Sequence, residues 1–205
     1  MHRFGLLAVL LVVATTTSLR AQTTWEFAPT AGYRYGGTVN SENGKFIAND
    51  GFAWGGTIGY RVKRDGLVEL VYSRQDTNIL FDADLAPEVT VGDAAIEYFQ
   101  IGGALEFGNN ENTKPFFALT VGTTHLSPQS SGLGDDWLFS FGGALGIKTY
   151  LSRNVGLRAQ ARLWMSSLYS DTDFWCTLPG GCVIVASNST FFTQGEFSGG
   201  VMFVF

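Results

Sequence analysis

The chain ends in the stretch FFTQGEFSGGVMFVF, residues 191–205. Counted back from the end, Phe205, Phe203 and Val201 fall on one side, whereas the other side is mixed and carries Glu196. A period of two predicts a β-strand with one apolar and one mixed face. A strand this apolar needs a paired edge and an apolar solvent, and a closed barrel in a bilayer supplies both.

Seven further segments alternate in the same way between large apolar residues and small or polar ones. In 51–63, for example, Trp54 and Ile58 share a face, and Gly55 and Thr57 share the other. Eight strands are an even number, as is usual for bacterial transmembrane barrels. The sequence therefore predicts an all-β fold, a closed antiparallel eight-stranded transmembrane β-barrel. The predicted strands before the last are 25–35, 51–63, 67–75, 94–107, 115–125, 137–151 and 155–167.

The connections between the predicted strands alternate in length. Short periplasmic turns and long external loops are typical of outer-membrane barrels. The large apolar residues are too numerous to fit inside eight strands, so we expect them to face lipid rather than a lipocalin-like interior. The long loops are predicted at 36–50, 76–93, 126–136 and 168–189, and the short turns at 64–66, 108–114 and 152–154.

Residues 1–21 have the pattern of a secretory signal peptide. A short basic start precedes an unbroken apolar run over 4–14, and Ala21 ends a segment suited to cleavage. The apolar run is too short to cross a bilayer as a helix. We therefore expect export, cleavage after Ala21 and one barrel domain over residues 22–205.

Both cysteines, Cys176 and Cys182, lie in the last predicted loop. An exported chain can keep them oxidised, and the turn residues 179–181 (Pro-Gly-Gly) can bring them together. A local disulfide is predicted, with a pair of free thiols as the alternative. Metal binding is disfavoured because no His or third Cys lies nearby in the sequence.

The signal peptide, the alternating strands and the aromatic end resemble the eight-stranded outer-membrane β-barrel proteins of the OmpA/OmpX and "porin family" type. The resemblance covers residues 22–205 and implies a bacterial outer-membrane location in contact with its lipid. It also implies that Val201, Phe203 and Phe205 form the signal that the barrel assembly machinery recognises. Such proteins include structural barrels, adhesins and a few enzymes, so the resemblance predicts an architecture more sharply than a function. We expect a monomer.

Charged residues on the inward faces predict an ionic network in the lumen. Counting across the two shortest turns places Arg61 opposite Glu69, and Lys148 opposite Arg158. Two facing cations are unfavourable unless a carboxylate lies between them. A filled network would plug the barrel, and the alternative is a thin, cation-lined pore. The predicted network consists of Arg61, Glu69, Glu106, Lys148 and Arg158, with Arg162 and Glu196 paired nearer the outside.

Three glycine pairs, at 55–56, 102–103 and 142–143, recur within predicted strands. A nucleotide-binding loop needs a helix after the strand, and no helical pattern follows any pair. The pairs are better explained by barrel curvature and by room for large neighbours. We therefore expect no bound cofactor or metal centre.

His125 and Ser127 are the residues that suggest catalysis. Outer-membrane lipid A deacylases use a His and a Ser at such spacing, with the imidazole activating the hydroxyl. Here Pro128 follows the serine, and no Glu lies at a suitable distance along the next predicted strand. Asp135 or Asp136 would orient the imidazole only if the loop folded back. A rim histidine without a catalytic role is the commoner case.

The predicted long loops are acidic, with Lys45 as their base. This charge argues against nucleic acid as a partner. A solvated rim explains the acids, and the sharper hypothesis is that they bind divalent cations and, through them, lipopolysaccharide phosphates. The acidic residues are Glu42, Asp50, Asp76, Asp82, Asp84, Glu88, Asp93, Asp135, Asp136, Asp171 and Asp173.

These observations favour a non-enzymatic outer-membrane protein with a structural or surface-interaction role through its acidic loops. A small passive diffusion pore is the alternative, and it requires a continuous wet lumen. A lipid-modifying hydrolase built on His125 and Ser127 is the third candidate.

Overall fold

The computed structural model of the protein describes residues 25–41, 44–83, 89–110, 112–129, 135–168 and 191–205. Every regular element in these residues is a strand, and none of them forms a helix long and apolar enough to span a bilayer. The strands are β1 (Trp25–Tyr35), β2 (Thr38–Ser41), β3 (Gly44–Ala48), β4 (Gly51–Lys63), β5 (Gly66–Ala83), β6 (Val89–Glu106), β7 (Thr113–Pro128), β8 (Asp136–Tyr150), β9 (Val155–Ser167) and β10 (Phe191–Val204).

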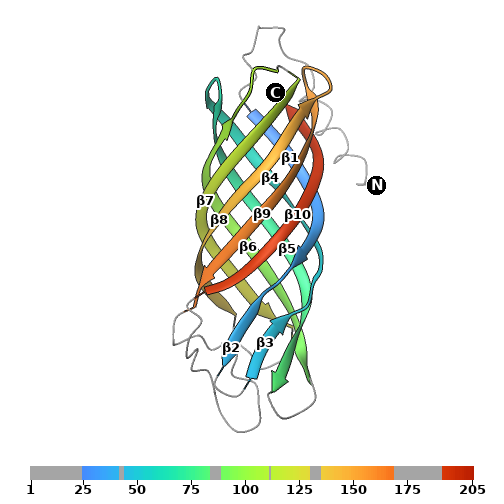
Figure 1. The fold of residues 1–205 in the computed structure, drawn as a ribbon, viewed down its shortest axis with the longest axis vertical. Coiled ribbons are helices and arrows are strands. Elements are labelled where there is room, and N and C mark those ends of the chain that lie inside the picture. The colour runs from blue at the N-terminus through green and yellow to red at the C-terminus, as the bar shows by residue number, and fades with distance from the viewer. Residues whose placement is uncertain (1–24, 42–43, 84–88, 111, 130–134, 169–190) are drawn as a thin grey trace, which may run out of the picture.

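Eight of these strands form a closed antiparallel barrel (Figure 1). Strand β1 pairs with β4 on one side and with the last strand, β10, on the other, so that Phe27 lies opposite Phe203. The barrel order runs from β5 through β4, β1, β10, β9, β8 and β7 to β6, and the pairing of β5 with β6 completes the ring. The predicted eight-stranded barrel is confirmed.

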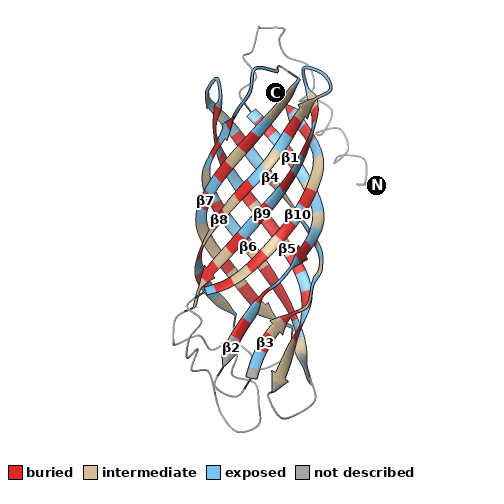
Figure 2. Ribbon diagram, in the orientation of Figure 1, coloured by how far each residue is buried: buried red, intermediate tan, exposed pale blue. Residues whose placement is uncertain are grey.

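The two faces of the barrel wall carry the residues that the alternation predicts. Large apolar side chains point outward, with 59 % of Phe197 and 65 % of Leu145 exposed, whereas Glu69 and Lys148 are fully buried inside. Buried and exposed residues alternate along the strands (Figure 2). Because an apolar outer wall is stable in lipid, the wall is the membrane-facing surface.

The short connections after β4, β6 and β8 lie at the same end of the barrel as the C-terminus (Figure 1). The hairpin of β2 and β3 lies at the opposite end. In outer-membrane barrels the short turns face the periplasm. The end with the β2–β3 hairpin is therefore the extracellular one.

Strands β5 and β6 are longer than the sequence predicts, because residues 76–83 and 89–93 continue them. The prediction of a loop at 76–93 is wrong at these positions. Beyond Gln75 the next outward residues, Asp76 and Asn78, are polar, and the inward ones change from Thr77 to the apolar Ile79. Outside the bilayer the outer face meets water, so the pattern of apolar residues outward ends although the strand continues.

Residues 36–50, predicted as a loop, contain the β2–β3 hairpin, and β3 pairs with the extended part of β5. Phe46 lies opposite Phe81, with ring centroids 4.8 Å apart. The hairpin adds apolar side chains to a buried layer at the extracellular end of the lumen, called here the mouth cluster. The mouth cluster consists of Val39, Phe46, Ala48, Val71, Ile79, Ala94, Ile96, Tyr98, Leu126, Leu138, Trp164 and Phe192.

Candidate functional site

Four charged side chains meet in the periplasmic half of the lumen. Lys148 Nζ lies 2.6 Å from Glu26 Oε2 and 3.0 Å from Glu106 Oε1. Arg61 donates to Glu106 at 2.9 Å and also to Glu26. The Tyr150 hydroxyl lies 3.2 Å from Glu26 and 3.3 Å from Glu106. Each carboxylate therefore contacts both cations, and this balanced group is called the periplasmic ion cluster.

A second ion pair crosses the lumen from β9 to β5. The two terminal nitrogens of Arg158 donate to the two oxygens of Glu69 at 2.7 and 3.0 Å. Lys148 Nζ lies 3.8 Å from Glu69, which connects the pair to the periplasmic ion cluster. The Arg158 guanidinium also lies 4.4 Å from the ring centre of Phe116. Bidentate geometry and full burial make this the best-defined polar contact of the lumen.

A third layer joins the mouth cluster on its periplasmic side and shares Tyr98 and Trp164 with it. Arg34 donates to Glu196 at 2.8 Å, and the indole of Trp164 donates to the same carboxylate at 3.1 Å. Trp164 stacks on Tyr98 with ring centroids 4.3 Å apart, and the Arg34 guanidinium lies 4.9 Å from the Tyr98 ring. Stacked rings and an ion pair are therefore packed against one another at this level of the lumen.

Arg162 is the buried cation without a carboxylate within ion-pair distance among the described residues. Its side chain donates to Thr120 Oγ1 at 3.3 Å and lies 4.9 Å from the Trp164 ring. Its Nε and Nη2 atoms are buried without a hydrogen-bond partner. Burying a guanidinium with unpaired donors costs folding free energy. Arg162 is therefore the lumen residue that we expect to destabilise the folded state.

The pairing of the lumen charges differs in two places from the sequence prediction. Arg61 lies opposite Leu67 rather than Glu69, because an irregularity between Arg61 and Lys63 shifts the register. Arg162 lies opposite Glu196 in the ladder, but no ion pair joins them, since Glu196 is held by Arg34.

Glu26 and Arg34 were not predicted as members of the network. Both lie on the polar face of the first strand, but their partners come from strands distant in the sequence. The contact of Arg34 with Glu196 depends on the register of β1 against β10. That register is set by barrel closure and not by a short turn that can be counted across.

The outer wall carries a second group of polar residues near the extracellular end. The barrel register places Arg74 opposite Glu97, Glu97 opposite His125, and His125 opposite Trp137. The imidazole stacks on the Trp137 ring at 4.4 Å. We call the polar members of this group the outer-wall polar cluster. It consists of Arg74, Asp76, Glu97, His125, Ser127 and Asp135.

Two carboxylates flank the imidazole of His125. Its Nδ1 lies 3.0 Å from Glu97 Oε2 and its Nε2 lies 3.2 Å from Asp135 Oδ2. The next strand, β8, carries no Glu, as the sequence indicates, and the glutamate beside His125 is Glu97 from the preceding strand, β6. The register across the turn between 106 and 113 places Glu97 opposite His125, so the sequence contains a signal for this contact.

Ser127 does not form the hydrogen bond that a serine nucleophile requires. Its hydroxyl donates a hydrogen bond to Asp135 Oδ1 at 3.0 Å. The acceptor of this hydrogen bond is therefore the carboxylate and not the imidazole of His125. A serine hydrolase places the hydroxyl within hydrogen-bond reach of the base nitrogen. His125, Ser127 and Asp135 lie close together, but Asp135 bonds both the imidazole and the serine, and no hydrogen bond joins the imidazole to the serine.

The remaining predicted residues are at the end of the chain and in the last loop. The side chains of the predicted assembly signal point outward, at Val201, Phe203 and Phe205. The amide of Phe205 donates to Trp25 O at 2.9 Å, where the last strand pairs with β1. The predicted Cys176–Cys182 disulfide lies outside the described residues. Within the described residues, no group of three or more His, Cys, Asp or Glu side chains is arranged to hold a metal ion.

The closed ring of eight strands, the apolar outer wall and the polar, side-chain-filled lumen define a small β-barrel of the bacterial outer membrane. Three solved structures share this fold at low sequence identity. Neisserial surface protein A is 18 % identical, with a TM-score of 0.58 over 88 % of this chain and 96 % of that one. The outer membrane protein OprG from Pseudomonas aeruginosa is 14 % identical, with a TM-score of 0.57 over 91 % and 99 %.

The N-terminal β-barrel domain of Pseudomonas aeruginosa OprF is 14 % identical, with a TM-score of 0.50 over 89 % of this chain and 98 % of that one. No family model matches the chain, and no curated protein matches it in sequence. At these identities the likeness concerns the fold. The function must therefore be argued from the lumen and the outer wall of this chain.

Proposed function

We propose that the protein is a non-conducting, non-enzymatic outer-membrane scaffold whose function lies on its outer surface and extracellular loops. The observation that carries this proposal is the filling of the lumen by charged side chains that are bonded to one another and almost fully buried. Arg34, Glu69 and Lys148 are 0 % exposed. Residues along a wet pore would instead keep solvent contact.

Successive layers support the closed lumen. The mouth cluster is apolar and lies at the extracellular end. The Arg34–Glu196 and Glu69–Arg158 pairs and the periplasmic ion cluster follow toward the periplasm. An ion entering this lumen would have to displace bonded side chains at each level. This is the structural argument against a passive diffusion pore.

The acidic extracellular end supports a surface-interaction role. Some of its acids are held by neighbours, since Asp50 accepts from the Gly36 amide and Asp93 from Asn78. The acids that remain in the loops give the rim a negative charge, for which divalent cations and, through them, lipopolysaccharide phosphates are the partners we propose. Signal-peptide cleavage, insertion by the barrel assembly machinery and a monomeric state complete the proposal.

The test is single-channel recording in planar bilayers with the refolded mature chain, residues 22–205. The wild type is expected to give no steady current steps. Glu106→Gln removes one charge of the periplasmic ion cluster and should give brief, irregular openings. Steady, ion-selective steps from the wild type would overturn the closed-lumen proposal and favour the pore.

A lipid-modifying hydrolase remains the second candidate because His125 is held by Glu97 and Asp135. The hydrogen bond of Ser127 to Asp135 argues against it. The assay is the release of fatty acid from ester-linked outer-membrane lipid by the refolded protein. Release that is lost in both His125→Ala and Ser127→Ala would replace the non-enzymatic proposal by this one.

A further inference from the structure

Arg162 has two hydrogen-bond donors that no acceptor among the described residues satisfies. Its Nη1 donates to Thr120 Oγ1 at 3.3 Å, whereas Nε and Nη2 are buried without a partner. The N–H bonds of Nε and Nη2 lie side by side on one edge of the planar guanidinium, on the side away from Nη1. One ligand can therefore accept a hydrogen bond from both donors at once.

The charges of the lumen do not balance. On the periplasmic side of the mouth cluster, every carboxylate among the described lumen residues is held by a cation other than Arg162. The carboxylates are Glu26, Glu69, Glu106 and Glu196, and the cations are Arg34, Arg61, Lys148, Arg158 and Arg162. One positive charge is left over in a space from which water is largely excluded, and a buried charge without a counter-charge is unfavourable.

A small void lies beside Arg162. The next inward residue of β9 toward the periplasm, Gln160, and its ladder partner Ser198 are each 8 % exposed. Farther along the lumen in the two directions, Glu69 and Trp164 are 0 % exposed. The exposed surface of Gln160 and Ser198 therefore belongs to an enclosed space that is wide enough for a water molecule. A void of this size with polar walls can hold one small polar ligand.

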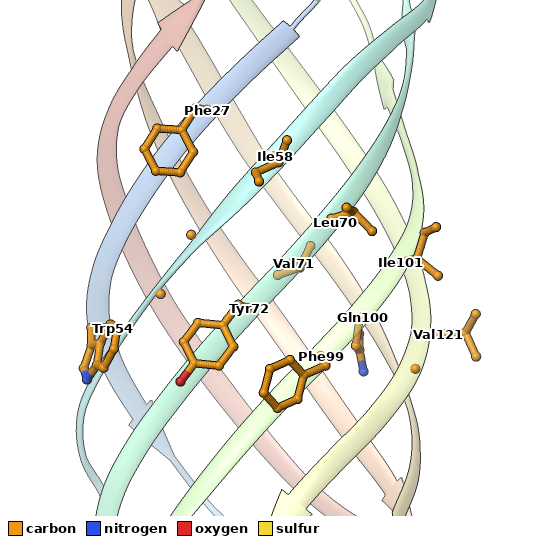
Figure 3. Close-up of a pocket in the computed structure, with 13 residues that line it drawn as sticks. Phe27, Trp54, Ile58, Leu70, Val71, Tyr72, Phe99, Gln100, Ile101 and Val121 are labelled. Atoms are coloured by element: carbon orange, nitrogen blue, oxygen red, sulfur yellow. The ribbon is translucent and has the colours of Figure 1, made fainter. Parts of the chain in front are cut away.

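The glutamines next to Arg162 already use their oxygens in other hydrogen bonds. Gln100 lies on the inner side of β6, behind the outward residues of the wall (Figure 3). Its amide oxygen accepts from the Thr120 hydroxyl. The amide oxygen of Gln160 accepts from Arg158 Nε at 3.0 Å. The acceptor for the two remaining donors of Arg162 has to come from a ligand.

We propose that the lumen binds one small monovalent anion, chloride, against the edge of Arg162 formed by Nε and Nη2. The anion accepts two charge-assisted hydrogen bonds and cancels the positive charge that the lumen carboxylates leave over. A water molecule would accept the same hydrogen bonds but would leave the charge without compensation. The anion is thus the ligand that satisfies both the donors and the charge.

The direct test is an X-ray structure of the mature chain refolded and crystallised in bromide. Refolding in bromide gives the anion access before the lumen closes, and bromide has the charge of chloride together with an anomalous signal. We expect one anomalous peak within hydrogen-bond distance of Nε and Nη2 of Arg162, and no such peak in Arg162→Met. Density without an anomalous signal at this edge, from a water molecule or a side chain, would overturn the proposal.

Stability against urea in lipid vesicles gives a second measurement. Chloride is exchanged at constant ionic strength for gluconate, which is too large for the void. Above the dissociation constant, the ratio of folded to unfolded wild type should rise about ten-fold for each ten-fold increase in chloride. Arg162→Met should show no such rise. In gluconate it should be at least as stable as the wild type, because it buries no unpaired guanidinium.

Arg74→Met is the matched control, because it removes a cation from the outer wall and leaves the lumen unchanged. Its stability should depend on chloride as that of the wild type does. An equal dependence on chloride in the wild type and Arg162→Met would contradict the proposal. The inference rests on the filled lumen of the proposed function, but the two fail separately. Steady current would show an open lumen, whereas the bromide peak and the chloride dependence report on Arg162.

Discussion

Glu69 and Arg158 are joined across the lumen by two hydrogen bonds of 2.7 and 3.0 Å, although their strands are not neighbours in the barrel. Burial removes water from both charges, so each depends on the other for stabilisation. The pair also fixes the distance between opposite walls of the barrel. The filled lumen therefore contributes to stability as well as blocking a pore.

We expect Glu69→Gln to lower the free energy of unfolding by about 3–5 kcal/mol, because it leaves Arg158 buried and without its counter-charge. Urea titration of the refolded protein in lipid vesicles, followed by tryptophan fluorescence, measures this loss. The control is Glu69→Gln combined with Arg158→Met, which removes both charges. The double variant should lose less than the sum of the two single changes, and additive losses would contradict a coupled pair.

Removing the charge of Arg162 should have the opposite effect on stability from removing the charge of Glu69. Since two of its donors are buried without partners, Arg162→Met should leave the free energy of unfolding unchanged or raise it by about 1–3 kcal/mol. The matched change Arg158→Met, two inward positions away on the same strand, should lower the free energy of unfolding. Equal destabilisation by both variants in the vesicle titration would show that Arg162 has a partner of equal value.

The sequence predicts the transmembrane part of this fold well because lipid outside and a narrow lumen inside impose a strict period of two. The predicted bounds of β1, β4 and β9 agree with the structure. The alternation of apolar outward and polar inward residues ends where the strands leave the lipid and enter water. Above the bilayer, the apolar positions of β5 turn inward at Ile79, and the β2–β3 hairpin has too few residues to show a period.

The site was less predictable because it depends on register across the whole ring. Counting across a turn finds neighbours such as Lys148 and Arg158, but one irregularity after Arg61 changes every partner beyond it. Contacts across the lumen depend on how the whole barrel closes. The same holds for contacts between the first strand and the last, β1 and β10, such as that of Arg34 with Glu196.

The glycine pair 102–103 gives a prediction with an internal control. A Cβ on Gly102 would collide with the carbonyl oxygen of Leu119 on the neighbouring strand, whereas a Cβ on Gly103 has Leu67 O as its nearest neighbour at 3.6 Å. Gly102→Ala should therefore lower the free energy of unfolding by about 1–3 kcal/mol or more, and Gly103→Ala should have little effect. Equal effects in the same vesicle titration would mean that close strand approach does not explain this pair.

Phe46 tests whether the β2–β3 hairpin is held by the mouth cluster. Its side chain is 4 % exposed, so Phe46→Ala should loosen the hairpin while the membrane-embedded barrel, which has its own ladder, stays folded. Amide hydrogen exchange should show faster exchange in β2 (38–41), in β3 (44–48) and in the paired end of β5, with unchanged protection in β9. Ile47→Ala, on the other face of the same strand, is the control and should exchange as the wild type. If Phe46→Ala accelerates exchange in β9 as well, the hairpin and the barrel form one cooperative unit, and the mouth cluster stabilises the whole protein rather than its extracellular end alone.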